Sequence, residues 1–283
     1  MDKVRQLLKD NVDPNAPYGK LQRRPVHEAA RRNLVDCLNM LIENGAEVDV
    51  EDSKGDTALH LAAWEGRISV CEALLDSGAD IDRCSGRDGS TALFCAVSGR
   101  HPDLVRILLS HGADSNVASA ELYPLHQASV TGQADVCKML LENNAIVNCM
   151  DQDGNTPLHY AATSGSTEIV KLLIDHGARP DMKQAAGLTA CHWAGHKGHK
   201  EVLKLLIEAG ADVNVRSETD VTPLHCAASA GHSSCARLLL KSGADVNVVT
   251  EDWNGKKGTP AKLAKAAGHK QLASLIGHYE RKK

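Results

Sequence analysis

Apolar residues follow two helical patterns that alternate along the chain, and the segment 156–177 shows both clearly. Leu158, Ala161 and Ala162 stand at positions i, i+3 and i+4, which places small side chains on one narrow face of a short helix. The stretch 168–174 then carries five apolar residues on a broader stripe, which predicts a second helix. The small residues of the first face would let neighbouring helices approach closely.

Capping residues mark the ends of these two helices. Thr156 is a good N-cap because its hydroxyl can accept a free backbone N–H, and Pro157 needs no N–H at the first helical position. The first helix is broken at 164–165, and Gly177 follows the second helix, where a left-handed C-cap is expected. Residues 151–154 predict a β-turn tip ahead of the cap. The predicted unit is therefore helix, turn, helix and extended tip.

A capping tetrapeptide, Thr-Pro-Leu-His or a near variant, recurs through the chain. Its copies start at residues 24, 57, 91, 123, 156, 189, 222 and 259. A second signature, Gly-Ala-Asp or a near variant, follows 21 residues after each of the first seven starts. Such self-similarity indicates a repeat protein, in which each unit buries its apolar face against its neighbours.

The tetrapeptide, exemplified by Thr156-Pro157-Leu158-His159, the Gly-Ala-Asp tip and the period together resemble the ankyrin-repeat family over nearly the whole chain. The resemblance implies an all-α fold, a solenoid of helix-turn-helix units with β-hairpin tips. We predict a single domain over 1–283, with seven repeats in 24–258 and a capping repeat over 259–283. Residues 1–15 align with the second half of a repeat, either as a natural N-terminal cap or as part of a longer protein.

Composition narrows the class of protein. Only 8 of the 283 residues are aromatic whereas 42% are apolar, so the core must consist of Leu, Ala, Val and Ile. A net charge of −4 and the scarcity of aromatic residues argue against nucleic-acid binding. The sequence has no apolar leader and no run long enough to enter a membrane. Nine cysteines, an odd number, favour free thiols in a reducing compartment, so we expect a cytoplasmic or nuclear protein.

Fourteen histidines suggest a metalloenzyme until they are placed in the repeat. Six of them take the fourth place of the tetrapeptide, where the resemblance implies a framework residue bonded to the Thr hydroxyl and nearby backbone. His192, His196 and His199 have the most metal-like spacing, but two of the three hold recurring positions in the repeat. The chain also contains no Cys-x-x-Cys pair, phosphate-binding loop or nucleophile elbow. We therefore expect no metal, no cofactor, no catalytic residue and no enzymatic activity.

The resemblance places variable contacts four, three and one residues before the Thr position and seven and eight after it. Some of those positions, the Tyr that replaces one capping Thr and the Trp of the longer tip 248–258 form the predicted partner-binding set. Its members are Lys20, Arg23, Arg31, Arg32, Lys54, Trp64, Glu65, Leu122, Tyr123, Val130, Leu188, His196, Lys197, Val221 and Trp253. The first end of this face is basic. Either it meets a partner segment with acidic and apolar residues, or it is a solvated face whose Leu and Val pack on adjacent tips.

These observations favour a non-enzymatic protein-interaction module, an adaptor, scaffold or inhibitor that binds a peptide segment or folded domain of another protein. Three alternatives stay open. The repeats could be the substrate-receptor arm of a ubiquitin ligase, which would need a suppressor-of-cytokine-signalling box beyond the C-terminus, or the regulatory part of an enzyme or channel. Anionic ligands or nucleic acid could bind at 20–32. The resemblance also suggests Asn214 and Asn247 as substrates of an asparaginyl hydroxylase.

Overall fold

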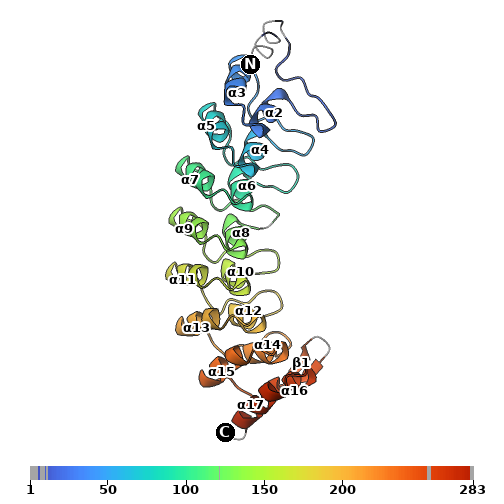
Figure 1. Ribbon diagram of the computed structural model, residues 1–283, viewed down its shortest axis with the longest axis vertical. Coiled ribbons are helices and arrows are strands. Elements are labelled where there is room, and N and C mark those ends of the chain that lie inside the picture. Colours follow the sequence, from blue (N-terminus) through green and yellow to red (C-terminus); the bar gives the residue numbers. More distant parts are fainter. Residues whose placement is uncertain (1–5, 7–9, 11, 121, 254–255, 281–283) are drawn as a thin grey trace. The chain divides into compact units, whose positions relative to one another are not determined.

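A computed structural model describes residues 6, 10, 12–120, 122–253 and 256–280 of the chain (Figure 1). The chain divides into two compact units, which are described separately. Unit 1 comprises residues 1–128 and 138–145, and unit 2 comprises residues 129–137 and 146–283. Most of the predicted half-repeat over 1–15 lies outside the described residues.

Unit 1 consists of paired helices that stack in two rows. The first row is α2 (Pro25–Arg31), α4 (Ala58–Trp64) and α6 (Ala92–Ser98), and the second row is α3 (Val35–Glu43), α5 (Ile68–Asp76) and α7 (Pro102–Ser110). Helices α8 (Pro124–Thr131) and α9 (Ala134–Glu142) are divided between the two units.

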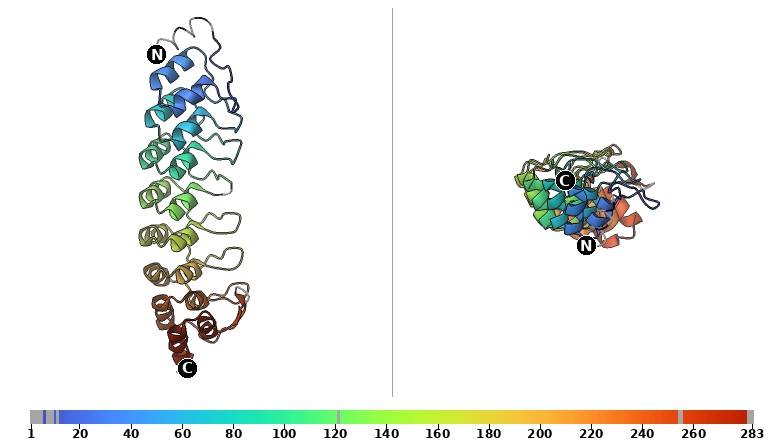
Figure 2. Two further views of the ribbon diagram at one scale, coloured as in Figure 1. Left: turned by 45° about the vertical axis from the view of Figure 1, so that its right-hand side comes forward. Right: turned by 90° about the horizontal axis from the view of Figure 1, so that it is seen from above.

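Unit 2 repeats this arrangement. Its first row is α10 (Pro157–Ser164), α12 (Ala190–Lys197), α14 (Pro223–Ala230) and α16 (Pro260–Ala266). Its second row is α11 (Thr167–Asp175), α13 (Lys200–Glu208), α15 (Ser233–Lys241) and α17 (Lys270–Glu280). Within each unit the tips project from one side of the helices (Figure 2). The all-α solenoid of helix-turn-helix units predicted from the sequence is confirmed, with a final helix pair over the predicted capping repeat.

The tips are mostly turns rather than the expected β-hairpins. In the described part of the chain the named strands are β1 (Thr250–Trp253) and β2 (Lys256–Gly258), an antiparallel pair, and isolated bridges join Tyr18 to Arg23 and Ser119 to Leu122. The reason is local. The side chain of Asp52 accepts hydrogen bonds from the backbone N–H groups of Lys54 (2.8 Å) and Asp56 (3.3 Å), which satisfies donors that a strand ladder would otherwise pair.

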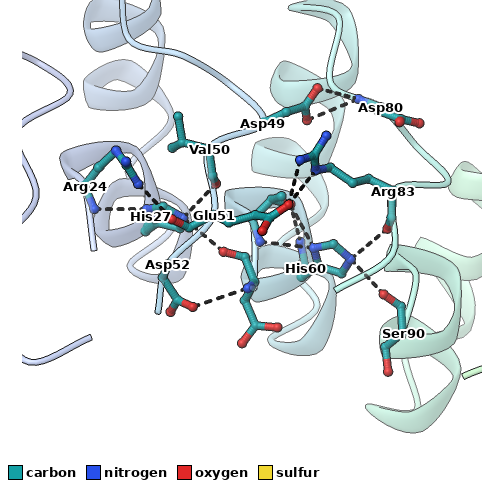
Figure 3. A network of polar contacts seen from close by, with 12 residues as sticks. Arg24, His27, Asp49, Val50, Glu51, Asp52, His60, Asp80, Arg83 and Ser90 are labelled. Atoms are coloured by element: carbon teal, nitrogen blue, oxygen red, sulfur yellow. Dashed lines mark hydrogen bonds and ion pairs between the residues drawn. The ribbon is translucent and has the colours of Figure 1, made fainter. Parts of the chain in front are cut away.

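Five tetrapeptide histidines act as the predicted framework residues and join a helix start to the next tip: His27, His60, His159, His192 and His225. The Nδ1 of His60 accepts from the backbone N–H of Thr57 (3.1 Å), so its proton lies on Nε2, which donates to the carbonyls of Arg83 (2.9 Å) and Ser90 (2.8 Å). His27 donates likewise to the carbonyls of Val50 and Asp56. Figure 3 shows both imidazoles between the helix that carries them and the following tip.

A second set of histidines covers glycines of the preceding repeat. The Nε2 of His101 donates to the carbonyl of Trp64 (3.0 Å), and His199 donates to the carbonyl of Thr163 (3.1 Å). A Cβ added at Gly66 would lie 2.5 Å from the His101 ring, and one at Gly165 would lie 2.6 Å from the His199 ring. Glycine is therefore required where the imidazole of the next repeat covers the backbone.

All nine cysteines are free thiols, and most of them are buried in the helix rows. Burial raises the pKa of the Cys71, Cys95 and Cys137 thiols to about 12, so these side chains pack as small apolar groups. A helix with the length and hydropathy needed to cross a lipid bilayer is absent from the described residues.

Candidate functional site

A pocket of about 290 Å³ in unit 1 brings together several of the residues predicted to bind a partner, and we call it the Trp64 pocket. It lies where α4 and α6 meet the tips that precede them. Its lining residues are Arg23, Lys54, Asp56, His60, Leu61, Trp64, Arg87, Asp88, Ser90 and Cys95.

Trp64 combines an exposed side chain with a fixed backbone. It is the last residue of α4, and 56% of its surface is exposed. Its carbonyl accepts the hydrogen bond from His101, and Gly99 packs so closely that a Cβ there would lie 2.8 Å from the same carbonyl oxygen. The indole can therefore meet a partner with little loss of backbone freedom on binding.

The tip beside Trp64 is organised by the buried carboxylate of Asp52. Arg23 donates from Nε to Asp52 (3.2 Å), and the Asp52 side chain has no exposed surface. Burial raises the pKa of Asp52, but hydrogen bonds from the Lys54 backbone and the Arg23 guanidinium outweigh it and hold that pKa below its ordinary value. Arg23 thus supports the tip that presents Lys54 and Asp56.

The pKa values of two carboxyl groups in the Trp64 pocket are shifted in opposite directions. Burial and repulsion from Asp52 and Asp88 raise the pKa of Asp56. Burial alone would raise the pKa of Asp88. Hydrogen bonds from Ser85 (2.8 Å) and the backbone of Ser90 (3.1 Å) lower that pKa by more than burial raises it, so the net pKa lies below the ordinary value. Asp88 is therefore held ionised, whereas Asp56 is the carboxyl that takes up a proton more readily.

Lys54 and Arg87 are the cations of the Trp64 pocket that remain available to a ligand. Both are exposed, and among the residues that the structure describes neither forms an ion pair. Leu61 and Cys95 supply apolar surface beneath them. The arrangement of an exposed indole, apolar surface and two cations can hold an apolar side chain together with a carboxylate.

The predicted basic cluster at the first end is only partly available, because three of its four cations pair with two carboxylates, so it carries less free positive charge than the sequence indicates. Arg31 pairs with Glu28 at 2.9 Å, and Arg32 pairs with the same carboxylate. Arg23 pairs with Asp52. Lys20 is the exposed cation of the cluster for which the described residues show no ion pair. The five contact positions read from the sequence omitted Glu28, which stands three and four residues before the two arginines on one helix face.

Other predicted contacts in unit 1 are partly occupied. Glu65 pairs with Arg67 at 3.4 Å beside Trp64. Tyr123 replaces the capping Thr, and its backbone N–H donates to the Nδ1 of His126 (3.2 Å). Leu122 is half-buried, with its backbone bridged to Ser119.

In unit 2 two predicted contact residues are buried, which is a second correction. Val221 has no exposed surface and Leu188 is 8% exposed, so neither side chain can meet a partner in this structure. Their carbonyls accept hydrogen bonds from His192 (3.0 Å) and His159 (3.2 Å), which pulls the backbone inward.

The remaining predicted residues of unit 2 do not gather into one described pocket. Val130 is 42% exposed, Lys197 is exposed and His196 is half-buried. Trp253 lies on β1, and its side chain falls outside the described residues.

The two candidate hydroxylation residues differ in their surroundings. The side-chain amide of Asn214 donates to the carbonyl of Gly243 (3.1 Å) and accepts from the backbone N–H of Asp245 (2.7 Å). Asn247 is exposed and donates its backbone N–H to Asp245. Modification of Asn214 would require these tip bonds to open first.

Two of the three histidines with metal-like spacing are engaged by the backbone. The ring of His192 bonds the backbone of Thr189 and Val221, and the Nε2 of His199 bonds Thr163. Over the described ranges no three His, Cys, Asp or Glu side chains gather as metal ligands would.

Arg87, Asp88 and Ser90 are pocket residues that the predicted set did not include. A signal for them was available, since they stand four, three and one residues before Thr91. Their charges are mixed and give no single-sign signal in the sequence, and it is the fold that brings them together with Trp64.

A family model described as "Ankyrin repeats (3 copies)" matches residues 1–85, 82–151, 118–184 and 179–250. The chain is 36% identical over 147 residues to the palmitoyltransferase AKR1 of Lachancea kluyveri, covering 50% of this chain and 20% of that protein. It is 35% identical over 137 residues to ankyrin repeat and SOCS box protein 3 of Bos taurus, covering 47% and 26%. It is 32% identical over 161 residues to the E3 ubiquitin-protein ligase XBAT32 of Arabidopsis thaliana, covering 47% and 32%. The matched chain thus spans a third or less of each of these relatives.

Proposed function

Because the chain belongs to the ankyrin-repeat family, whose fold is generally a non-enzymatic module that binds other proteins, we propose that it binds a segment of a partner protein at the Trp64 pocket. We further propose that it acts by binding alone, as an adaptor, scaffold or inhibitor, and that it is not itself an enzyme. The observation that carries the proposal is an indole that is 56% exposed on a rigid helix end. Exposed tryptophans that fill a partner's pocket dominate many protein interfaces.

The partner segment would combine an apolar residue with an acidic one. The apolar residue would pack on Trp64 and Leu61, and the acidic residue would approach Lys54 and Arg87. Asp88 stays ionised and so sets a limit on how many carboxylates the pocket accepts. A segment with one or two acidic residues next to a large apolar residue therefore fits best.

A second candidate role is the substrate-receptor arm of a ubiquitin ligase. Two relatives favour it by their names, the ankyrin repeat and SOCS box protein of Bos taurus and the E3 ubiquitin-protein ligase of Arabidopsis thaliana. In that role the Trp64 pocket would hold the substrate. The palmitoyltransferase relative similarly supports the alternative of a regulatory part of a larger enzyme. The ion pairs of Arg23, Arg31 and Arg32 count against anionic-ligand or nucleic-acid binding at 20–32.

The nine free thiols support residence in a reducing compartment, the cytoplasm or nucleus. Imaging of the tagged full chain would test this proposal, and secretion of the chain would contradict it.

Quantitative affinity purification tests the Trp64 pocket. The full chain would be used as bait in three forms: wild type, Trp64→Ala, and Met150→Ala as a matched exposed apolar control, since Met150 is 47% exposed and lies outside the pocket. We expect a set of proteins retained by wild type and Met150→Ala and depleted at least tenfold by Trp64→Ala. Equal recovery by all three baits would refute the proposed site. Enrichment of ubiquitin-ligase subunits by all three would favour the receptor role.

A further inference from the structure

Positive charge is concentrated at the end of the chain. Residues 256–283 contain eight of the 32 Lys and Arg residues but only one of the 36 Asp and Glu residues. This segment of 28 residues therefore carries a net charge of +7 in a chain whose net charge is −4. Such asymmetry within one chain points to a surface with its own electrostatic partner.

The described part of this segment forms a groove in unit 2, which we call the C-terminal groove. It lies along α16 and α17 and has a volume of about 620 Å³. Its lining residues are Asn247, Thr259, Ala261, Lys262, Lys265, Lys270, Ala273, Ser274 and Gly277. The small residues of both helices make a shallow floor, and the three lysines stand exposed around it.

The three lysines carry uncompensated charge. Within the described residues, none of Lys262, Lys265 and Lys270 forms an ion pair, and no carboxylate lines the groove. Lys262 and Lys265 are three residues apart on one helix, an arrangement of like charges that is unfavourable.

Some helices elsewhere in the chain balance a lysine with a glutamate. Lys138 pairs with Glu142 and Lys204 pairs with Glu208, each four residues apart on a second-row helix. A capping repeat needs a polar outer face, but a mixture of Glu and Lys would satisfy that need equally well. A face of one sign therefore needs a further explanation.

We propose that the C-terminal groove docks an acidic helical segment of another protein. Carboxylates three or four residues apart on a helix match the spacing of Lys262 and Lys265, and the floor of Ala261, Ala273 and Gly277 admits a small apolar side chain. Three lysines present point charges that suit single carboxylates. This surface lies outside the Trp64 pocket, so it would bind independently of the proposed function.

The groove is less suited to other polyanions. No aromatic side chain lines it, so nucleic-acid bases would have no surface on which to stack. Among the described residues of α16 and α17, no large apolar side chain is exposed that would insert into a lipid surface. These two classes serve as competing outcomes of the test.

Fluorescence anisotropy with the full chain tests the proposal. The probe is a fluorescein-labelled 16-residue helical peptide of Ala and Glu with Glu at i and i+4, without the large apolar residue that the Trp64 pocket would need, and its control has Gln in place of every Glu. The triple variant Lys262→Gln, Lys265→Gln, Lys270→Gln is compared with Lys138→Gln, Lys171→Gln, Lys204→Gln, which removes the same charge from second-row helices. Because all six lysines are exposed, both variants should fold, which circular-dichroism melting would verify.

We expect micromolar binding of the Glu peptide that weakens with salt, a loss of at least tenfold in the groove variant, and less than twofold in the control variant. Trp64→Ala should leave this binding unchanged. Absence of binding at 100 µM peptide, equal binding of the Gln peptide, or equal weakening by both triple variants would overturn the proposal. Tighter binding of a 16-nucleotide oligo-dT or of phosphatidylserine vesicles than of the Glu peptide would also overturn it.

Discussion

The Nε2 of His101 lies 3.0 Å from the carbonyl oxygen of Trp64, so the start of α7 holds the end of α4, the first helix of the preceding repeat. Because the donor ring also covers Gly66 and Gly99, the backbone at this point has little room to move. The same contact that stacks the repeats therefore also fixes the base of the exposed indole. Loss of the hydrogen bond between His101 and the Trp64 carbonyl should therefore affect both the stability of the fold and the position of the Trp64 side chain.

Substitution of Gly66 tests this coupling. Gly66 has φ +67, and a Cβ there would meet the His101 ring at 2.5 Å, whereas Gly132 has φ +73 with nothing within 4 Å. Gly132→Ala should cost about 1 kcal/mol for the left-handed conformation alone. Gly66→Ala should cost roughly 2–3 kcal/mol because the ring must also shift. Urea unfolding measures both, and equal costs would show that the His101 contact contributes nothing.

Two arginines of the Trp64 pocket should separate stability from binding. Arg23→Gln removes a donor from the buried carboxylate of Asp52, so we expect it to lower the free energy of unfolding by about 1–3 kcal/mol. Arg87→Gln removes an exposed cation that forms no ion pair within the described residues, so it should change stability by less than about 0.5 kcal/mol.

Partner binding, unlike stability, should depend on Arg87. Arg87→Gln should weaken retention of the proteins that depend on Trp64 although the chain is fully folded. Retention unchanged by Arg87→Gln would remove Arg87 from the proposed contact, and a stability loss equal to that of Arg23→Gln would assign it a structural role instead.

The sequence predicted the fold well because the relevant interactions are local. Thr57 and His60 are three residues apart, and their capping bonds follow from that spacing. The burial of Val221 could not be read in the same way, since its carbonyl is drawn inward by His192 from the preceding repeat, 29 residues away. The pairing of Glu28 with Arg31 is local and was open to prediction, but contact positions counted from the Thr alone passed over it.

Acid should destabilise the chain over the pH range between the unfolded and folded pKa values of the buried framework histidines. Burial lowers the pKa of His192 and of His225 from 6.5 to about 4, because the charged form is poorly solvated and Nδ1 already accepts a backbone N–H. Between pH 6.5 and 4 the unfolded chain therefore binds more protons than the folded chain, and stability falls as pH falls.

The size of this effect follows from linkage. Each of the two histidines should cost roughly 1–2 kcal/mol at pH 5, and urea midpoints measured at pH 7.5, 6 and 5 should fall in that order. The carboxyls with lowered pKa, such as Asp52, act only below about pH 4, so they do not account for loss in this window. A midpoint that stays constant from pH 7.5 to 5 would contradict the burial of neutral imidazoles.

Thiol labelling should distinguish the single exposed cysteine from the buried ones. Cys84 is exposed, whereas burial raises the pKa of Cys71, Cys95, Cys137 and Cys149 to about 12 and removes the reactive thiolate. Brief alkylation of the native chain, followed by peptide mass spectrometry, should modify Cys84 first and Cys37, which is half-buried with a raised pKa, more slowly. The buried thiols should react only at the rate at which the repeats open, and labelling in urea should reach all nine. Labelling of Cys71 or Cys95 as fast as Cys84 would mean that the helix rows around the Trp64 pocket open readily, and a rigid support for the indole would then be untenable.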